Sequence, residues 1–223
     1  MSMNNIINEP VKEYLPGSEE KKSLLEEYNN QSNKKIEIPI IIGGERIFTG
    51  DIGHCIAPHN HKKVLASYHK ADKETVDKAI KNSLDAWKDW SNTKIEERTT
   101  IFRKAATLLA GKWRNKINAA TMLNQSKNAH QAEIDAACEL IDFFNLNSSF
   151  AENINSKQDL ISPNDTKNYL EYRPLEGFVF AIAPFNFTSI AGNLPSAPAL
   201  MGNVSLWKPA SSAILACYYL MEM

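Results

Sequence analysis

A continuous apolar run near the carboxyl end of the chain, Phe178–Ala183, constrains the fold more than any other feature. A strand without polar alternation is expected to be buried on both faces, as in a parallel sheet. The run ends in a proline-initiated loop at residues 184–188, a helix of small residues follows, and a second apolar run occupies residues 204–207. Lys208 then opens another helix. This alternation predicts an α/β fold that starts a doubly wound parallel sheet.

Upstream of that sheet, the sequence predicts a β-hairpin followed by a helical region. Two β-rich runs within residues 36–48 surround the pair Gly43-Gly44, which is typical of a two-residue hairpin turn. Five further elements are expected from apolar spacing: a strand at 64–68, a helix capped by Asp72, and helices at 95–111, 114–123 and 130–146. The last helix is apolar on two nearly opposite sides, so we expect it to be packed on both.

The composition is that of a globular protein and excludes several functional classes. Hydrophobic residues make up 43% of the 223 residues and charged residues 23%, unlike a disordered or fibrous chain. The 25 Lys and Arg residues balance 26 Asp and Glu residues, so no nucleic-acid or anionic-membrane partner is indicated. No apolar run approaches the ~20 residues of a membrane span.

The cysteines are few and scattered. Cys55, Cys138 and Cys217 are odd in number and far apart, which favours a reducing compartment over a disulfide framework. Cys138 is expected to be a small core residue. Residues 1–12 show no targeting signal, so either the protein is cytosolic or a presequence lies outside this chain.

A group of histidines near Cys55 is the one arrangement that resembles a metal site. His54, Cys55, His59 and His61 lie close together in the sequence. Their spacing matches no standard zinc pattern, and Pro58 indicates a loop. We therefore predict no metal.

The chemistry is expected in the loops that follow the two buried strands, because ligands bind beyond the carboxyl ends of strands in open α/β sheets. Neither loop contains the G-x-G-x-x-G fingerprint. Lys208 is either a surface lysine or a ligand for a ribose or phosphate. Asn186 is either a turn former or an amide donor aimed at an oxyanion.

The segments 176–188 and 202–209 resemble the aldehyde dehydrogenase superfamily. Within it, Phe-Asn-Phe-Thr at 185–188, together with residues 131–144 and 8–11, is similar to the branch that oxidises L-glutamate gamma-semialdehyde to L-glutamate in proline degradation. The resemblance covers nearly the whole chain. It implies an aldehyde dehydrogenase-like fold, NAD as hydride acceptor, and a thiohemiacetal and thioester on a cysteine.

The resemblance also implies roles for individual residues. Asn186 matches the asparagine whose amide stabilises the oxyanion, and Lys208 matches the lysine that binds the adenosine ribose. Ala183, Pro184 and Phe185 match the stretch that lines the NAD cleft.

Two positions depart from the family pattern. Ser211 stands where many relatives have an acidic residue that also binds the ribose. Because a neutral serine repels a 2′-phosphate less than a carboxylate does, strict selectivity for NAD over NADP is not implied. Ala183 stands where the branch often has serine, which removes one hydroxyl contact.

Substrate selection is expected to involve Glu139 and Phe187. On a helical wheel, Glu139 shares an apolar face with Ala136 and Phe143, where a carboxylate needs a cation or donors to satisfy it. Three alternatives are open: a cation from another helix, simple exposure, or the α-ammonium group of the substrate. The resemblance favours the third, with Phe187 packed against the substrate chain.

We expect four parts along the chain. Residues 1–35 form an N-terminal arm, in which residues 16–35 are a polar, mobile helix and linker at the surface, and residues 36–147 form the hairpin and helical part of the NAD-binding domain. Residues 148–172 are a polar segment that runs into a strand at 169–173 and resembles an oligomerisation flap. Residues 173–223 form the first βαβα unit of the NAD-binding sheet.

The family's catalytic cysteine and general-base glutamate match no residue in this chain, so we expect an incomplete, N-terminal portion that is inactive alone. The alternatives are a non-catalytic nucleotide-binding or subunit-associating protein, and another aldehyde dehydrogenase subfamily. The family further implies a homo-oligomer in the mitochondrial matrix.

Overall fold

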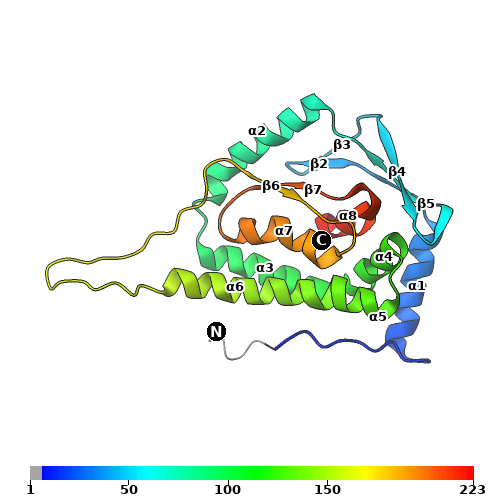
Figure 1. Cartoon of the computed structure of the whole chain (residues 1–223), viewed down its shortest axis with the longest axis horizontal. Coiled ribbons are helices and arrows are strands. Elements are labelled where there is room, and N and C mark those ends of the chain that lie inside the picture. Colours follow the sequence, from blue (N-terminus) through cyan, green and yellow to red (C-terminus); the bar gives the residue numbers. More distant parts are fainter. Residues whose placement is uncertain (1–6) are drawn as a thin grey trace.

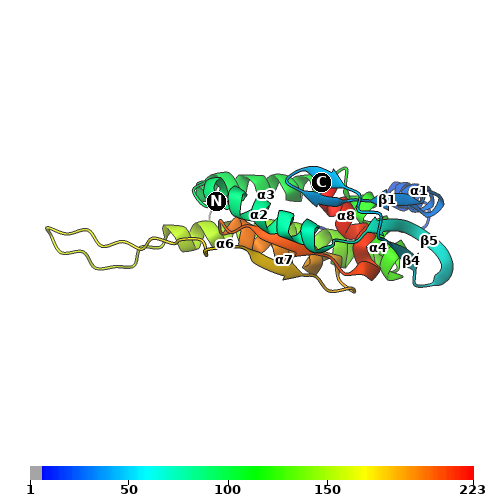
Figure 2. The same cartoon turned by 90° about the horizontal axis from the view of Figure 1, so that it is seen from above.

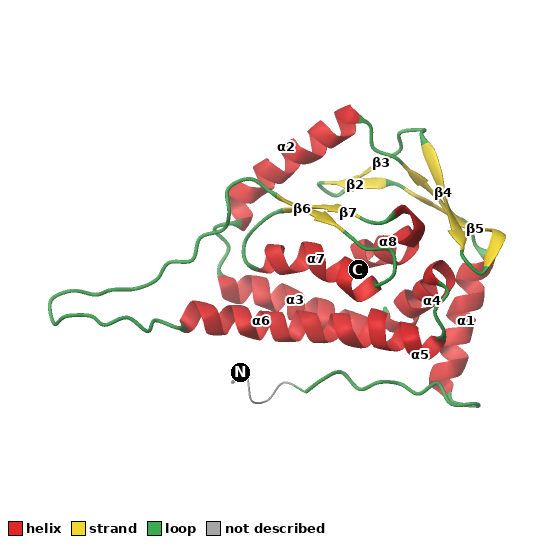
Figure 3. Ribbon diagram, viewed as in Figure 1, coloured by secondary structure: helices red, strands yellow, loops and turns green. Residues whose placement is uncertain are grey.

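The computed structural model describes residues 7–223 and confirms the predicted α/β class. The helices of residues 95–110 and 140–156 lie along one side of the molecule, and the strands lie on the other side together with the helix of residues 73–90 (Figures 1 and 3). The helices are α1 (Glu19–Asn33), α2 (Lys73–Trp90), α3 (Ile95–Ala110), α4 (Arg114–Gln125), α5 (Ala129–Ala132), α6 (Leu140–Ser156), α7 (Thr188–Leu200) and α8 (Ile214–Glu222). The strands are β1 (Ile36–Ile38), β2 (Ile40–Ile42), β3 (Glu45–Ile47), β4 (Ile52–Ala57), β5 (Asn60–His69), β6 (Val179–Ile182) and β7 (Ser205–Lys208).

The predicted hairpin is confirmed between β2 and β3, but its first residues belong elsewhere. Gly43 and Gly44 both have positive φ, +58° and +82°, which a two-residue turn of this hand requires. A Cβ at Gly43 would also lie 2.6 Å from the Asn82 side chain. The preceding residues form β1, which pairs in parallel with β5 in a separate sheet.

The loop expected at Pro58 is a two-residue turn, Pro58-His59, which joins the antiparallel strands β4 and β5. The pairing of β4 with β5 also shifts register on either side of Ile56. The sequence of β4 hides its strand character because Gly53 and His54 break the apolar pattern. Its inward side chains, Cys55 and Ala57, are nevertheless fully buried.

The predicted helices are confirmed, but the fourth is longer and is interrupted. Asp72 caps α2 as expected, accepting a hydrogen bond from the Thr75 amide. The last helix runs on to Ser156, ten residues beyond the predicted end, and residues Glu133–Glu139 form a π-helical turn between α5 and α6. Its two-sided packing is confirmed, because α6 contacts both α3 and α7, and Leu140 and Ile141 lie in the main core.

The helix expected within residues 16–35 is confirmed as α1, but it is packed against the rest of the molecule and does not stand free at the surface. Helix α1 packs along α4, with Leu24 buried beside Ala119. The described part of the preceding segment runs beside the π-helical turn, where the Tyr14 hydroxyl donates to Glu133 Oε2 at 2.6 Å. Residues 1–6 lie outside the described part of the chain.

Residues 157–177 project beyond the end of α6 as an exposed, irregular excursion (Figure 2). The strand predicted at 169–173 is wrong, since these residues have no strand partner within the described chain. Instead, the Gln158 side chain bonds the backbone of Leu170 across the excursion. We find no helix among residues 7–223 with the length and apolar character needed to cross a membrane.

Strands β6 and β7 pair in parallel as predicted, with Ile182 opposite Lys208. The expected burial of both faces is wrong in the structure, because Phe180 is 57% exposed and Ile182 60% exposed. Helix α7 covers only the other face, where Ala181 is buried.

Candidate functional site

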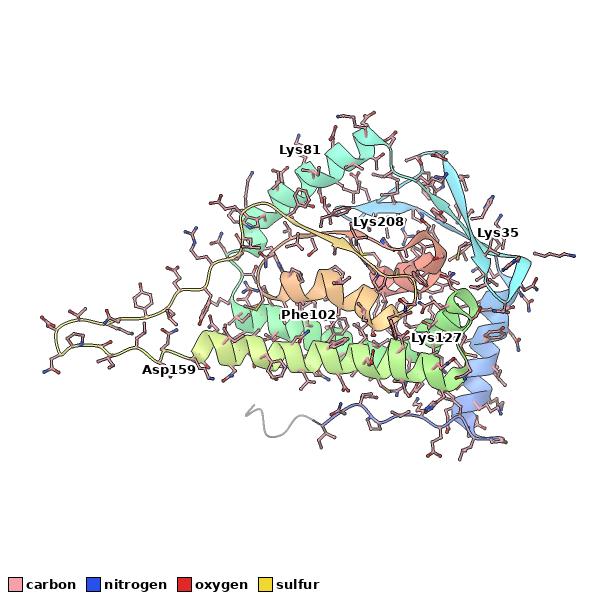
Figure 4. All side chains as sticks on the ribbon, viewed as in Figure 1. Lys35, Lys81, Phe102, Lys127, Asp159 and Lys208 are labelled. Atoms are coloured by element: carbon pink, nitrogen blue, oxygen red, sulfur yellow. The ribbon has the colours of Figure 1, made fainter. Side chains whose placement is uncertain are left out.

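The two loops predicted to carry chemistry leave the same edge of the β6–β7 pair. The Ala183 amide, just beyond β6, donates to the Lys208 carbonyl at 3.0 Å. Residues 184–187 then lead into α7, and residues 209–213 lead into α8. The candidate residues Ala183 to Phe187, Lys208 and Ser211 are therefore neighbours at one strand-end edge (Figures 1 and 4).

Asn186 stands at the outer part of the first loop with its amide available. It is exposed between Phe185 and Phe187, which are 66% and 40% exposed. Its side chain makes no hydrogen bond within residues 7–223, whereas a turn-forming asparagine normally bonds its own local backbone. This geometry supports the amide-donor role over the turn-forming one.

Lys208 ends β7 with an exposed side chain and has no ion pair among the described residues. Ser211 follows in a short 3-10 helix and is also exposed. Asn124 of α4 fixes this loop: its amide donates to the Ser212 carbonyl at 2.5 Å, and its oxygen accepts from the Leu215 amide at 3.0 Å.

Glu139 ends the π-helical turn, half-buried, and faces the start of α7. Its Oε2 atom lies 2.7 Å from the Ser189 hydroxyl. The alternative of a cation from another helix does not describe Glu139, because no Lys or Arg of residues 7–223 pairs with it. The alternative of simple exposure does not describe it either, because its side chain is half-buried. The carboxylate therefore lies beside the loop of Asn186 and Phe187, with acceptor capacity to spare.

Sequence reasoning missed two residues that hold this loop, Asp135 and Lys127. Asp135 accepts bonds from the first amides of α7, and Lys127 pairs with it at 2.6 Å. The only signal in the sequence was an aspartate in an alanine-rich helix, four residues before Glu139. A helical wheel could not identify its target, because the π-helical turn changes the angular spacing.

The profile of the aldehyde dehydrogenase family matches residues 49–223. The chain belongs to the aldehyde dehydrogenase family. In solved structures, it is similar to the delta-pyrroline-5-carboxylate dehydrogenase of Mycobacterium tuberculosis, with a TM-score of 0.95 and 46% identity over 97% of this chain and 40% of that chain. The same enzyme has been solved with bound NAD.

Curated relatives agree with the structural match. The chain is 44% identical over 98% of its length to a probable delta-1-pyrroline-5-carboxylate dehydrogenase of Schizosaccharomyces pombe, covering 40% of that protein. It is 46% identical over 96% of its length to the human mitochondrial enzyme of that name, covering 38%. The chain thus spans about two fifths of the length of these relatives.

In this aldehyde dehydrogenase family chain, none of the three cysteines is placed as a nucleophile. Cys55, Cys138 and Cys217 are all buried. Burial raises the pKa of Cys55 to about 11 and the pKa values of Cys138 and Cys217 to about 12. A thiol with such a pKa forms almost no thiolate near neutral pH. The expectation that Cys138 is a core residue is confirmed.

The histidine group near Cys55 is dispersed by the β4–β5 pair. Cys55 points into the core, where the Asn124 amide lies 2.9 Å from its sulfur. His59 lies at the turn and bonds Ser126. Residues 7–223 contain no group of three or more ligands placed to hold a metal ion.

A buried ion pair beside the site ties the N-terminal arm to the helices. Glu133 and Arg114 are almost completely buried and bond each other, and Asn118 also donates to Glu133 at 2.7 Å. Burial alone would raise the pKa of Glu133, but the bonds from Arg114 and Tyr14 outweigh it and hold the pKa below its usual range. Glu133 is therefore a structural anchor, on the side of the turn away from Glu139.

Proposed function

We propose that this chain supplies the substrate-binding and NAD-binding loops of a delta-1-pyrroline-5-carboxylate dehydrogenase, which oxidises L-glutamate gamma-semialdehyde to L-glutamate. The observation that carries the proposal is that Asn186 and Lys208 lie in the loops at one end of the β6–β7 pair, and that the carboxylate of Glu139 contacts Ser189 at the start of the helix that follows Asn186. The relatives at 44–46% identity support the same activity.

The residues of this edge fit NAD. Lys208 and Ser211 present an exposed cation and a hydroxyl at the carboxyl end of β7. In the proposal, Lys208 donates to the ribose hydroxyls of the adenosine half, and Ala183, Pro184 and Phe185 line the cleft beside it. When bound, NAD accepts the hydride that leaves the aldehyde carbon. Because Ser211 is neutral, NADP is repelled only weakly.

Asn186 is proposed to stabilise the negative charge that develops on the aldehyde oxygen. Its side-chain amide makes no hydrogen bond within residues 7–223, so its N–H groups are available to the aldehyde oxygen as the charge forms. The nucleophile is not one of Cys55, Cys138 and Cys217, because all three are buried with raised pKa values. The chain therefore positions aldehyde and cofactor and does not attack the carbonyl itself.

Glu139 is proposed to bind the α-ammonium group of glutamate semialdehyde. Its Oε2 is occupied by Ser189, and a carboxylate has about four lone-pair sites for further donors. Phe187 is partly exposed beside it and is proposed to pack against the aliphatic chain of the substrate.

We further infer a mitochondrial matrix location and a homo-oligomer. The human, rat and zebrafish relatives are named as mitochondrial, whereas the Schizosaccharomyces pombe and Agaricus bisporus relatives carry no such label. Residues 148–172 are proposed as the oligomerisation flap, since residues 157–172, which project beyond α6, have little support from their own molecule.

The proposed function is tested by comparing substrates in an active enzyme that contains this chain. We expect NADH formation with glutamate semialdehyde at a higher kcat/KM than with aliphatic aldehydes of similar length. Lys208→Ala should weaken NAD binding, measured by titration calorimetry, whereas the exposed control Lys81→Ala should leave it unchanged. Preference for simple aliphatic aldehydes would overturn the assignment in favour of another subfamily.

A further inference from the structure

We propose that Asp135, held by Lys127, is a positioning residue that sets the location of the Asn186 amide; this inference rests on the proposed function. The reason lies in how α7 begins. Its N-cap residue, Phe187, has no side-chain acceptor for the first amides of the helix. Those amides need a partner when they are buried.

Asp135 supplies that partner from a different element. Its Oδ2 accepts from the Thr188 amide at 3.0 Å, and its Oδ1 accepts from the Ser189 amide at 3.2 Å and lies 2.9 Å from the Ser189 hydroxyl. A carboxylate at a helix N-terminus is further stabilised by the helix dipole. Because Asn186 lies two residues before Thr188, the same bonds fix where its loop ends.

Lys127 contacts both Asp135 and the loop that carries Asn186. Its ammonium lies 2.6 Å from Asp135 Oδ2 and 4.5 Å from the centre of the Phe187 ring. Both side chains of the ion pair are largely buried, at 16% and 5% exposed. Lys127 therefore contacts both the capping carboxylate and the residue next to Asn186 (Figure 4 labels Lys127 beside the start of α7).

Helix α4 also bonds to the start of α7. The Thr188 hydroxyl lies 2.8 Å from the Thr121 hydroxyl and accepts from the Gln125 amide at 2.7 Å. The start of α7 is thus fixed by backbone bonds and side-chain bonds together. Asn186 itself has no bond of this kind within residues 7–223, so its position depends on the anchored residues next along the chain.

Ser189 connects this anchor to substrate selection. Its single hydroxyl lies within hydrogen-bond distance of Asp135 and of Glu139, at 2.9 and 2.7 Å. A hydroxyl has one proton, so it donates to one carboxylate at a time. The residue that positions the oxyanion donor and the residue proposed to bind the amine therefore share one partner.

The test is a double-mutant cycle in an active enzyme that contains this chain. Asp135→Asn keeps the shape but removes the charge that holds Lys127, and we expect a loss in kcat of roughly tenfold or more, because a small misplacement of a catalytic group is costly. In an Asn186→Ala background, Asp135→Asn should have little further effect on kcat, because the amide that it positions is gone. KM for NAD should stay within a few-fold in both backgrounds.

The matched control is Asp142→Asn. Asp142 lies on α6 and also accepts a backbone bond, from the Glu9 amide of the N-terminal arm, so its loss should leave kcat within a few-fold. Equal losses from Asp135→Asn with and without Asn186 would show general destabilisation and overturn the proposal. If Asp135→Asn fails to fold, Lys127→Met enters the same cycle with the same expectations. An inactive parent enzyme would contradict the proposed function instead.

Discussion

Asn186 is the residue whose role the structure makes easiest to test. Removing one oxyanion donor lowers kcat by roughly 10²–10³-fold in comparable sites, and we expect that loss for Asn186→Ala in an active enzyme that contains this chain. NAD affinity should barely change, because in the proposed role the amide donates to the aldehyde oxygen and not to NAD. Steady-state kinetics measure the effect on kcat and NAD titration measures the effect on NAD affinity, with Asn168→Ala in the projecting segment as control. A kcat within a few-fold of the parent would restore the turn-forming interpretation.

Glu139 should select substrates by charge. Glu139→Ala is expected to lower kcat/KM for glutamate semialdehyde by a factor that corresponds to about 2–4 kcal/mol of lost transition-state stabilisation, if the pair with the ammonium group is desolvated. Aldehydes of similar length without an amine should be spared, since they never used the carboxylate. Measuring kcat/KM for both kinds of aldehyde separates a role in substrate selection from a role in the fold. Equal losses for both substrates would mean that Glu139 only supports the fold through Ser189.

At the scale of elements, the ion pair between α3 and α6 predicts an acid dependence of stability. Glu152 accepts from Arg103 and Thr99, and the Arg103 bonds are the main reason that its pKa is lowered to about 2 from an ordinary 4.5. Because the folded-state pKa is the lower one, the pair's stabilisation is present above about pH 4.5 and is lost as the pH falls toward 2. Both side chains are partly exposed, so solvent screens the pair and reduces its contribution to stability.

Urea unfolding at pH 5 and pH 3 measures this contribution. The parent should lose more stability between the two pH values than Glu152→Gln does. Lys73 and Asp77 form an exposed pair on α2, so Asp77→Asn provides the matched control and should follow the parent. An identical pH response for the parent and Glu152→Gln would contradict the assignment.

The elements that could be predicted are those whose signal is local. The Gly43-Gly44 turn and the Asp72 cap each depend on residues adjacent in sequence, and the parallel β6–β7 pair follows from the strand–helix–strand order of one continuous segment. The misses depend on distant partners: β1 leaves the hairpin to pair with β5, and the polar N-terminal arm is fixed by Glu133 and Arg114. The same limit applies to the site, where Asn186 and Lys208 were predictable from strand-end loops but Asp135 was not.

For the molecule as a whole, we expect residues 1–223 alone to show no NAD-dependent aldehyde oxidation. The physical reason is that every cysteine is buried with a raised pKa, so no thiolate can attack the carbonyl. Purified chain with glutamate semialdehyde and NAD should give NADH at the rate of a no-protein control. Turnover above that control would overturn both this expectation and the view that the chain only positions its ligands.

The solubility of the isolated chain depends on the exposed apolar face of its sheet. The exposed face of β6 presents Phe180 and Ile182, and an apolar sheet face open to water favours association. We expect the isolated chain to aggregate at concentrations where Ile182→Lys does not, as measured by light scattering. Leu160→Lys, in the exposed projecting segment, should not relieve aggregation to the same degree. Equal scattering from the parent and Ile182→Lys would show that this face is not the cause.

The π-helical turn has a consequence for how this chain tolerates changes in length. Within Glu133–Glu139, one carboxylate reaches the N-terminal arm while Asp135 and Glu139 reach α7. The π-helical turn holds one more residue than an α-helical turn. One continuous helix therefore presents carboxylates both to the N-terminal arm and to α7. Loss of one residue here would close the turn into regular α-helix and leave α6 close to its present orientation, but it would turn the carboxylates of the stretch relative to one another by roughly 100°. This short stretch should therefore tolerate substitution at the exposed Ile134 and almost no change in spacing.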